Sequence, residues 1–416
     1  MRYVIIGGCI AACGAVEGIR SKDADGQIII IDGEKRGAYT RPLISYFLSE
    51  PDKYSDIDYR SPEFFKDQRV EVIKARVESI DRAGQLLDLD SGEQIEYDRL
   101  LIATGASPIM PPIPGADQDW VKSFYTIGDS ESINRDIEAV REAVVIGSGL
   151  IGMKAAEALY KRGLKVHLIE KESHILPRQL NPGSAVFVYR HLARKGLDII
   201  TGAEVAVIHP DHQIELKSGQ KISADLVIMA VGTRPNVELA VKAGLKVKLG
   251  IVLDDHLRTS DDRIYAAGDA AETLNVISGK PEVMALLPHA HREGYQAGRN
   301  MTGMDEHDQG SIPMNSVKLL GWNICSAGTP GDKNGELLTW HDNDRLLELK
   351  VRDNYLIGYI AVNMPEVAGP LTNATAKKIS AAAGGWQVFV ERGPALATIP
   401  AAYWQELRRL EANGSN

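Results

Sequence analysis

Short runs of consecutive apolar residues recur along the chain, and most of them lead directly into glycine or acidic residues. The runs at 4–6, 28–31, 100–102, 143–146 and 226–231 consist mainly of branched aliphatic residues. Continuous runs of this kind are typical of strands covered on both faces of a parallel sheet, whereas half-exposed strands alternate. Helical segments rich in small residues follow the first and the fourth run. The pattern therefore predicts an α/β fold built on parallel sheets.

The order of strand, glycine-rich turn and helix occurs twice, about 140 residues apart. The first turn follows the fingerprint G-x-G-x-x-G incompletely, with Gly7, Cys9 and Ala12 at its three positions, whereas the second, at 147–152, is complete. Such turns place the pyrophosphate of a dinucleotide on the N-terminus of the following helix. The sequence thus predicts two Rossmann-like dinucleotide sites, with Cys9 tolerated as a small residue.

Each copy also carries an acidic residue near the end of its second strand. Asp32 and Glu34 are both candidates in the first copy, and Glu170 takes this place in the second. A carboxylate here accepts a hydrogen bond from a ribose hydroxyl and repels a 2′-phosphate, so Glu170 favours NADH over NADPH. Lys165 and Lys171 lie close to Glu170 in the sequence and weaken this preference.

The remaining segments divide the chain into three predicted domains. Four prolines between 108 and 114 mark a linker. A strand ending in Gly268-Asp269 and a helix opening near 287 return to the first domain, and alternating segments after 311 predict a small antiparallel sheet with helices behind it. The expected domains are a discontinuous first dinucleotide-binding domain at 1–113 and 251–310, a second one inserted at 114–250, and a C-terminal α+β interface domain at 311–416.

Composition and charge exclude several other classes of protein. A net charge of −9 leaves no basic surplus for phosphates, so no nucleic-acid partner is expected. No apolar run approaches the ~20 residues of a membrane span, and a strand is already under way at Tyr3, so we expect a cytoplasmic protein without a membrane segment. The three cysteines form no zinc cluster, and the histidines at 209–212 are assigned to a polar turn. We therefore expect no metal.

Together these motifs resemble the two-dinucleotide-binding-domain flavoproteins of the pyridine nucleotide-disulfide oxidoreductase superfamily, over about residues 1–400. In that family FAD lies on the first turn and NAD(P)H on the second. The segment 39–45 is similar to the flavin-side segment of rubredoxin and ferredoxin reductases and of the flavin module of assimilatory nitrite reductases. The disulfide reductases and the NADH peroxidases and oxidases place a redox cysteine in or just after this segment. Here no cysteine occurs between Cys13 and Cys325, so disulfide or sulfenate chemistry beside the flavin is not expected.

The resemblance assigns cofactor contacts residue by residue. It makes Glu34 the preferred ribose-binding acid at the first site and implies that Asp269 hydrogen-bonds the FAD ribitol. The helix opening at Pro288 would point its N-terminus at the flavin N1/O2 edge, where reduced flavin carries negative charge. The predicted FAD contacts are Gly7, Cys9, Ile10, Ala11, Ala12, Glu34, Arg41, Pro42, Val77, Ala103, Thr104, Gly105, Gly268, Asp269, His289 and Ala290. The predicted NAD(H) contacts are Gly147, Gly149, Leu150, Ile151, Gly152, Glu170 and Gly232.

Lys154 departs from the family pattern. Related enzymes commonly carry a glutamate at this position, and the reductases with the sequence Arg-Pro-Pro-Leu-Ser-Lys carry a lysine where this chain has Tyr46. We predict that Lys154 is the catalytic cation near flavin N5, where it would stabilise the reduced flavin. The alternative is an exposed helix lysine, since lysines are usually solvated.

The three cysteines are expected to be chemically quiet. The helix N-terminus would partly activate the thiol of Cys9, and bound FAD would shield it. Cys13 is expected to pack against the sheet, and Cys325 is expected in the core of the C-terminal domain.

The sequence therefore predicts an FAD-dependent oxidoreductase that takes hydride from NADH and passes electrons to an acceptor. The resemblance and the missing cysteine favour a small electron-carrier protein, such as a rubredoxin or ferredoxin, or a larger reductase complex as the partner. One alternative is an NADH oxidase that reduces dioxygen. Another is a redox-sensing or structural flavoprotein subunit of a larger complex. The family resemblance also leaves room for a homodimer, because dimers are common among its members.

Overall fold

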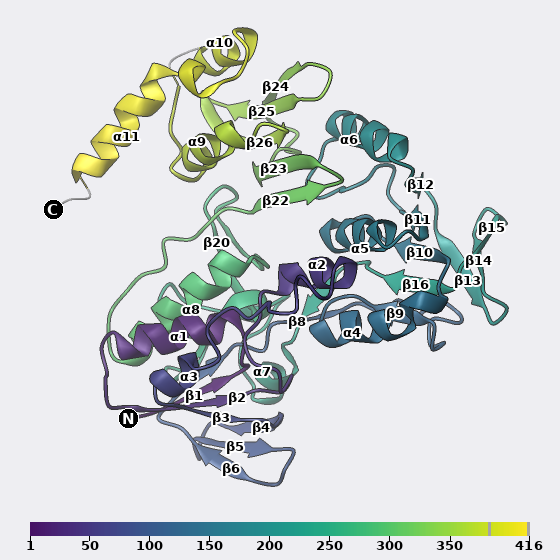
Figure 1. Ribbon diagram of the computed structural model, residues 1–416. Coiled ribbons are helices and arrows are strands. Elements are labelled where there is room, and N and C mark those ends of the chain that lie inside the picture. Colours follow the sequence, from purple (N-terminus) through teal and green to yellow (C-terminus); the bar gives the residue numbers. More distant parts are fainter. Residues whose placement is uncertain (382–383, 414–416) are drawn as a thin grey trace. The chain divides into compact units, whose positions relative to one another are not determined.

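The computed structural model describes residues 1–381 and 384–413 (Figure 1). These residues form two compact units. The first contains Met1–Ile44, Asp52–Ser107 and Thr233–Ser311, and the second contains the described residues of Ser45–Pro51, Pro108–Gly232 and Ile312–Asn416. Each unit therefore joins segments that are far apart in the sequence. The finer division into three domains, with the boundaries given above, stays a prediction.

A five-stranded parallel sheet forms the centre of the first unit, with the strand order β19–β7–β1–β2–β3. Strand β1 pairs with both β2 and β7, so that Ile6 lies opposite Ile31 and Ile102. The apolar side chains of these three strands are buried on both faces, which confirms the pattern in the sequence. The strands are β1 (Arg2–Ile6), β2 (Gln27–Ile31), β3 (Val70–Ile73), β7 (Arg99–Ile102) and β19 (Ile264–Ala266).

The second unit contains a parallel sheet with the order β12–β11–β10–β16–β9, in which four strands follow the connectivity of the first sheet. The fifth strand differs, because β9 comes before the central strand in the sequence, whereas β19 is the last strand of the first sheet. Here β10 takes the place of β1, because Ile146 lies opposite Ile169 and Met229. A glycine turn and a helix follow each of these two central strands, so the repeat predicted from the sequence is confirmed. The strands are β9 (Val121–Ser123), β10 (Glu142–Ile146), β11 (Lys165–Ile169), β12 (Asp198–Ile200) and β16 (Leu226–Met229), and the two helices are α1 (Ile10–Arg20) and α5 (Leu150–Lys161).

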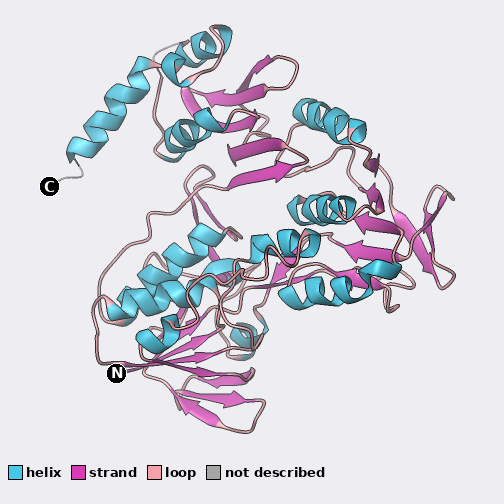
Figure 2. Cartoon of the chain, viewed as in Figure 1, coloured by secondary structure: helices cyan, strands magenta, loops and turns pink. Residues whose placement is uncertain are grey.

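Smaller elements complete the two nucleotide-binding parts of the chain (Figure 2). Two small antiparallel sheets have three strands each. The first contains β4 (Val77–Asp81), β5 (Leu86–Leu89) and β6 (Gln94–Glu96), and the second contains β13 (Val205–His209), β14 (Gln213–Leu216) and β15 (Lys221–Ser223). A two-stranded sheet contains β8 (Ala106–Pro108) and β17 (Thr233–Pro235). A further three-stranded sheet contains β18 (Ile251–Val252), β20 (Ala271–Asn275) and β21 (Lys280–Glu282). The remaining helices are α2 (Ile44–Ser49), α3 (Phe64–Asp67), α4 (Ile127–Asp136), α6 (Pro182–Arg194), α7 (Glu238–Lys242) and α8 (Leu287–Met301).

The C-terminal part of the second unit is an antiparallel sheet with helices after it, as the alternating segments predicted. Its strand order is β22–β23–β26–β25–β24. The elements are β22 (Met314–Leu319), β23 (Trp322–Gly328), β24 (Glu336–His341), β25 (Leu346–Arg352), β26 (Tyr355–Val362), α9 (Pro365–Ala376), α10 (Gly385–Glu391) and α11 (Ala401–Asn413). Across the described residues, no helix combines the length and the apolar character needed to cross a membrane.

Helices α1 and α8 lie side by side in the first unit and make an unusually close contact (Figure 1). Glycines at four positions permit it, because a Cβ at any of them would collide with a backbone oxygen of the other helix. At Gly14 and Gly18 that oxygen would be 2.1 Å away, and at Gly294 it would be 2.0 Å away. Gly298 meets the oxygen of Ala15 at 2.3 Å in the same way. The two helices are therefore packed backbone against backbone, and the N-terminus of each is held in a fixed position.

We expect Gly294→Ala to destabilise the protein strongly. The added methyl group has no space, so α8 must move away from α1, and overpacking of this kind typically costs about 1–3 kcal/mol or more. Urea unfolding followed by circular dichroism, together with the flavin content of the purified protein, measures the effect. The matched control is Gly369→Ala in α9, where a Cβ would meet no atom within 4 Å. Equal stability of the two variants would contradict the proposed role of the glycine contact.

Candidate functional site

The turn after β1 requires glycine at its first position. The Gly7 N–H donates to the oxygen of Ile31 at 2.9 Å, and the residue has a φ of +111°. A Cβ at Gly7 would lie 2.2 Å from the oxygen of Ala103, which begins the turn after β7. The close approach therefore brings two of the predicted FAD-contact segments together.

Cys9 occupies the second fingerprint position without backbone strain. It is the N-cap of α1 with a φ of −107°, outside the left-handed region, so a residue with a side chain is accommodated. Its Sγ hydrogen-bonds the oxygen of Tyr39 at 3.7 Å. At the matching position of the second turn, Gly149 also has a negative φ, of −66°. The turn conformation is therefore compatible with cysteine, and the N–H groups of the first turn of α1 remain suited to a phosphate.

The thiol chemistry at this turn differs from the prediction. Burial raises the pKa of the Cys9 thiol, and this effect outweighs the lowering by the positive charge of Arg41. The expectation of a partly activated thiol at Cys9 was therefore wrong, because the helix end does not compensate for the loss of solvent. Burial also raises the pKa of Cys13 to about 12. Cys13 and Cys325 are buried, as predicted.

The two acidic candidates of the first site have different surroundings. The buried carboxylate of Asp32 accepts the N–H of Glu34 at 3.1 Å and that of Gly37 at 2.9 Å, so it closes the loop between them. The carboxylate of Glu34 accepts from the Tyr39 hydroxyl at 2.9 Å and from the Arg41 guanidinium at 2.7 Å. The structure thus brings the predicted FAD residues Glu34 and Arg41 together, and Asp32 supports their loop.

Asn236 organises the turn after β7, although it was not among the predicted contacts. Its side-chain amide donates to the oxygen of Thr104 at 2.9 Å, and its N–H donates to the oxygen of Gly105 at 2.9 Å. In return, the Thr104 hydroxyl donates to the Asn236 oxygen at 2.7 Å, and the Ser107 hydroxyl donates to Oδ1 at 2.8 Å. The sequence signal was the position of Asn236 at the end of the segment 232–236, after the late strand of the second copy.

Glu293 on α8 holds the turn that carries Asp269. Its carboxylate accepts the N–H of Gly268 at 2.8 Å and the hydroxyl of Thr273 at 2.8 Å, and the side chain is buried. Burial raises the pKa of Glu293 to about 7 in spite of these two hydrogen bonds. Gly268 has a φ of +73°, which favours glycine at this point of the turn. Glu293 therefore ties the start of the Gly268–Ala270 turn to α8, and sequence reasoning did not single it out.

His289 lies in the first turn of α8 and is uncharged near neutral pH. Burial, assisted by the charge of Arg292, lowers its pKa to about 4. Its Nε2 contacts the hydroxyl of Ser311, and its Nδ1 is buried without a hydrogen-bond partner among the described residues. A neutral imidazole leaves the backbone N–H groups of α8 as the donors at this helix end, which agrees with the backbone role expected for His289.

The second turn repeats the geometry of the first. Gly147 has a φ of +101°, and its Cβ would lie 2.4 Å from the oxygen of Ala230. A Cβ at Gly152 would lie 1.9 Å from the oxygen of Gly147, so the third glycine is also required. A Cβ at Gly149 would meet nothing within 4 Å, so the middle of the turn is open. Such an opening beside a helix N-terminus fits the approach of a pyrophosphate.

Glu170 lies beside this turn and is buried. One oxygen of its carboxylate accepts the N–H of Ser148 at 2.7 Å and its hydroxyl at 2.5 Å, and the other accepts the N–H of Glu172 at 2.8 Å. The carboxylate thus lies beside the second turn and stabilises it. Its contact with a ribose, and its repulsion of a 2′-phosphate, stay predictions.

Lys154 is not an exposed helix lysine, so that alternative was wrong. Its side chain is only 15% exposed, and its ammonium forms an ion pair with Glu157, lies 3.3 Å from the oxygen of Lys318 and sits 4.3 Å from the ring centroid of Tyr46. Burial opposes ionisation of Glu157, but the hydrogen bond and charge of Lys154 hold its pKa below the usual range. Lys154 and Tyr46 therefore form a cation–π pair, at the two positions where the family resemblance leads us to expect glutamate and lysine.

The other predicted contacts lie close to these turns or begin the elements that follow them. Val77 opens β4, and Gly232, with a φ of +122°, follows the end of β16. The helical ones are Ile10, Ala11 and Ala12 in the first turn of α1, Arg41 and Pro42 in the 3₁₀ helix Arg41–Leu43, Leu150 and Ile151 in the first turn of α5, and Ala290 in α8. Their direct contacts with the cofactors stay predictions.

Two parallel-sheet units, each with a glycine turn leading into a helix N-terminus, define an oxidoreductase of the class that uses two dinucleotides. The family described as pyridine nucleotide-disulphide oxidoreductase matches residues 1–294, and the chain belongs to this family. It is an NAD(P)H-dependent oxidoreductase with FAD and NAD(H) as cofactors. The open middle of the second turn fits a dinucleotide, and the N–H groups at the start of α1 fit the other.

Individual relatives agree with this assignment. An NADH oxidase from Methanocaldococcus jannaschii is 35% identical over 317 residues, which cover 73% of this chain and 71% of that protein. A rhodocoxin reductase from Rhodococcus erythropolis is 34% identical over 322 residues, which cover 75% of this chain and 74% of that protein. The solved structure of the ferredoxin reductase for the CYP199A2 system from Rhodopseudomonas palustris matches with a TM-score of 0.82 and 28% identity, over 87% of this chain and 91% of that chain.

Glu293 should make the stability of the FAD-loaded protein depend on pH. Its folded pKa of about 7 lies above the ordinary value of 4.5, so the contribution is fully present below pH 4.5 and is lost as the pH rises through 7. The loss is at most about 3 kcal/mol on this basis. Urea unfolding across this pH range should show the decrease in the wild type and a flatter profile for Glu293→Gln. Glu131→Gln, at an exposed position of α4, should keep the wild-type profile, and an unchanged profile in Glu293→Gln would refute the prediction.

Lys154→Met should lower the flavin midpoint potential and slow flavin reduction by NADH at least about tenfold, because a cation near reduced flavin stabilises its negative charge. Spectroelectrochemistry and anaerobic stopped-flow reduction measure the two effects. Lys161→Met is the matched control, since Lys161 also pairs with Glu157, at 3.1 Å, but lies farther from the Tyr46 ring, at 5.9 Å. If Lys154→Met changed neither quantity, or if both variants changed them equally, the catalytic role of Lys154 would be abandoned.

Proposed function

We propose that this chain takes hydride from NADH and delivers electrons to a small carrier protein of the rubredoxin or ferredoxin type. The observation that carries the proposal is the lack of any cysteine between Cys13 and Cys325 in a chain with two nucleotide turns. Without a thiol beside the flavin, electrons leave through the flavin itself. The names of relatives such as rhodocoxin reductase and ferredoxin reductase support a protein acceptor.

The residues of the chain bind and orient the cofactors, while bound FAD supplies the chemistry of hydride acceptance and electron release. Glu34 and Arg41 would hold the ribose and phosphate end of FAD, and the Gly268–Ala270 turn, fixed by Glu293, would present Asp269 to the ribitol. The N–H groups at the start of α8 would face the negative edge of the flavin ring. Lys154, paired with Tyr46 and Glu157, would place a cation near N5.

The proposal includes a preference for NADH. The buried carboxylate of Glu170 is fixed beside the second turn by Ser148 and Glu172, so it does not turn away easily from an approaching 2′-phosphate. Like-charge repulsion at this short range disfavours NADPH. We further propose a cytoplasmic protein, in agreement with its composition, and a homodimer as the functional assembly, in agreement with the frequency of symmetric dimers.

A second candidate function is the reduction of dioxygen, because one relative is named an NADH oxidase. This reaction needs no docking surface for a partner protein. A third candidate is a redox-sensing or structural flavoprotein subunit, which would bind both cofactors without turnover.

Anaerobic reduction of the FAD-loaded protein, followed by reoxidation in a stopped-flow instrument, separates the three functions. We expect NADH to bleach the flavin absorbance with a second-order rate constant at least about tenfold above that of NADPH, since a misplaced charge of this kind is worth more than ~1.4 kcal/mol. Rubredoxin or ferredoxin should then reoxidise the flavin faster than air-saturated buffer. Faster reoxidation by air would establish the oxidase function, and failure of NADH to bleach the flavin would establish the subunit without turnover.

A further inference from the structure

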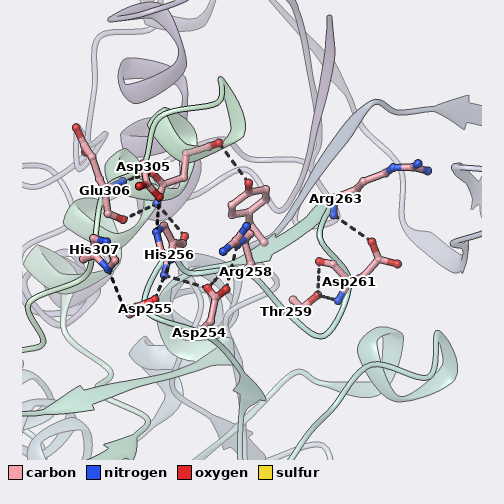
Figure 3. Close-up of polar contacts among 12 residues, drawn as sticks. Asp254, Asp255, His256, Arg258, Thr259, Asp261, Arg263, Asp305, Glu306 and His307 are labelled. Atoms are coloured by element: carbon pink, nitrogen blue, oxygen red, sulfur yellow. Dashed lines mark hydrogen bonds and ion pairs between the residues drawn. The ribbon is translucent and has the colours of Figure 1, made fainter.

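Two histidines and two aspartates meet at a surface of the first unit that none of the predicted cofactor contacts share (Figure 3). Asp255 and His256 belong to the segment after β18, and Asp305 and His307 to the segment after α8. The Asp255 carboxylate lies between the two imidazoles, with Oδ1 at 2.8 Å from Nδ1 of His256 and Oδ2 at 2.8 Å from Nδ1 of His307. The potential ligand atoms of Asp255, His256 and His307 all lie within 4.8 Å of one another.

The backbone around the cluster is fixed before any ion binds. Asn300, at the end of α8, donates its amide to the oxygens of His256 and Glu306 at 2.9 and 2.8 Å. The Asp254 carboxylate accepts the N–H of His256 at 2.9 Å, and the Asp308 N–H donates to the oxygen of Asp255 at 2.6 Å. The two segments are thus held together by several independent hydrogen bonds, so the ligands are preorganised.

The hydrogen bonds of His256 assign its two ring nitrogens different roles. Nε2 lies 2.7 Å from Oδ1 of Asp305, and an ionised carboxylate only accepts, so the proton of a neutral imidazole resides on Nε2. In this tautomer Nδ1 keeps its lone pair. Nδ1 is shielded from solvent and has no hydrogen-bond partner among the described residues, although it lies 2.8 Å from Oδ1 of Asp255. The lone pair of Nδ1 is therefore available to a metal ion.

We propose that Asp255, His256 and His307 bind a divalent transition metal ion of the zinc type, with Asp305 orienting His256 from behind. Two imidazoles and one carboxylate form a ligand set that suits zinc and leaves one position for water. Zinc bonds of roughly 2.0–2.1 Å place tetrahedral ligand atoms about 3.3 Å apart, so the 2.8 Å pairs need only small outward movements. A carboxylate behind a metal-bound histidine is the usual support of such sites.

The bound ion would join the segment after β18 to the segment after α8. His307 and Asp255 are 52 positions apart in the sequence, which explains why no motif revealed the site. The ion would also hold the end of α8, the helix whose other end is expected to face the flavin. The proposal does not depend on the acceptor or on the nucleotide preference of the enzyme.

Titration of the FAD-loaded, chelator-treated protein with Zn²⁺ in a calorimeter tests the proposal. We expect one zinc ion per chain, a higher thermal unfolding midpoint with zinc, and X-ray absorption data that show two imidazole ligands. His256→Ala and His307→Ala should each weaken binding at least about tenfold, and Asp305→Asn should weaken it by a similar factor as a supporting residue. His307 is 53% exposed, so its substitution leaves folding intact even if that of the more buried His256 does not.

His209→Ala is the matched control, because His209 pairs with Glu215 at 2.9 Å outside the cluster and should not affect zinc binding. Mg²⁺ should not compete, since magnesium prefers oxygen ligands. Absence of saturable binding would mean that protons alone neutralise the cluster and would overturn the proposal. Equal binding by the His307→Ala variant, or equal affinity for Mg²⁺, would overturn it as well.

Discussion

The backbone contact between α1 and α8 is the constraint on which the first unit depends. α1 carries the turn expected to bind the FAD pyrophosphate, and α8 begins where the flavin ring is expected. Four glycines let the two helices approach until backbone oxygens occupy the space of side chains. Because the helices cannot slide past such contacts without collision, the distance between the two helix N-termini is fixed. A fixed spacing would hold the pyrophosphate and the flavin ring of a flexible cofactor at a set distance from each other.

A buried carboxylate stabilises the backbone next to each of the two nucleotide turns, but its hydrogen-bond partners differ. In the first, Gly8 leaves room for the Asp32 side chain, which binds the backbone of the following loop. In the second, Ser148 occupies the equivalent place and bonds to Glu170 through both its N–H and its hydroxyl. The carboxylate is buried in both cases, and backbone N–H groups satisfy it. Both copies of the repeat thus have a buried acid after the second strand, and the groups that donate hydrogen bonds to it differ between the copies.

Much of the fold was predictable because it rests on local signals. Apolar runs predicted the strands, and glycines directly after them predicted the turns. The repetition of both predicted the two parallel sheets. The residues that sequence reasoning missed act across long separations in the chain. Asn236 bonds to Thr104, 132 positions away, and Glu293 bonds to Gly268 from another element. The thiol of Cys9 was misjudged for a related reason, since its pKa depends on burial by distant segments that no local pattern reports.

The pair formed by Lys154 and Tyr46 constrains how this sequence can change during evolution. The resemblance to related reductases implies a glutamate and a lysine at these two positions, so the positive charge would lie on the opposite member of the pair there. Tyr46→Lys alone would place two ammonium groups together, and Lys154→Glu alone would place a second carboxylate beside the buried Glu157. Each single step is penalised by like-charge repulsion in a poorly solvated place. In this chain the two positions therefore depend on each other, and neither can change its charge alone without a loss.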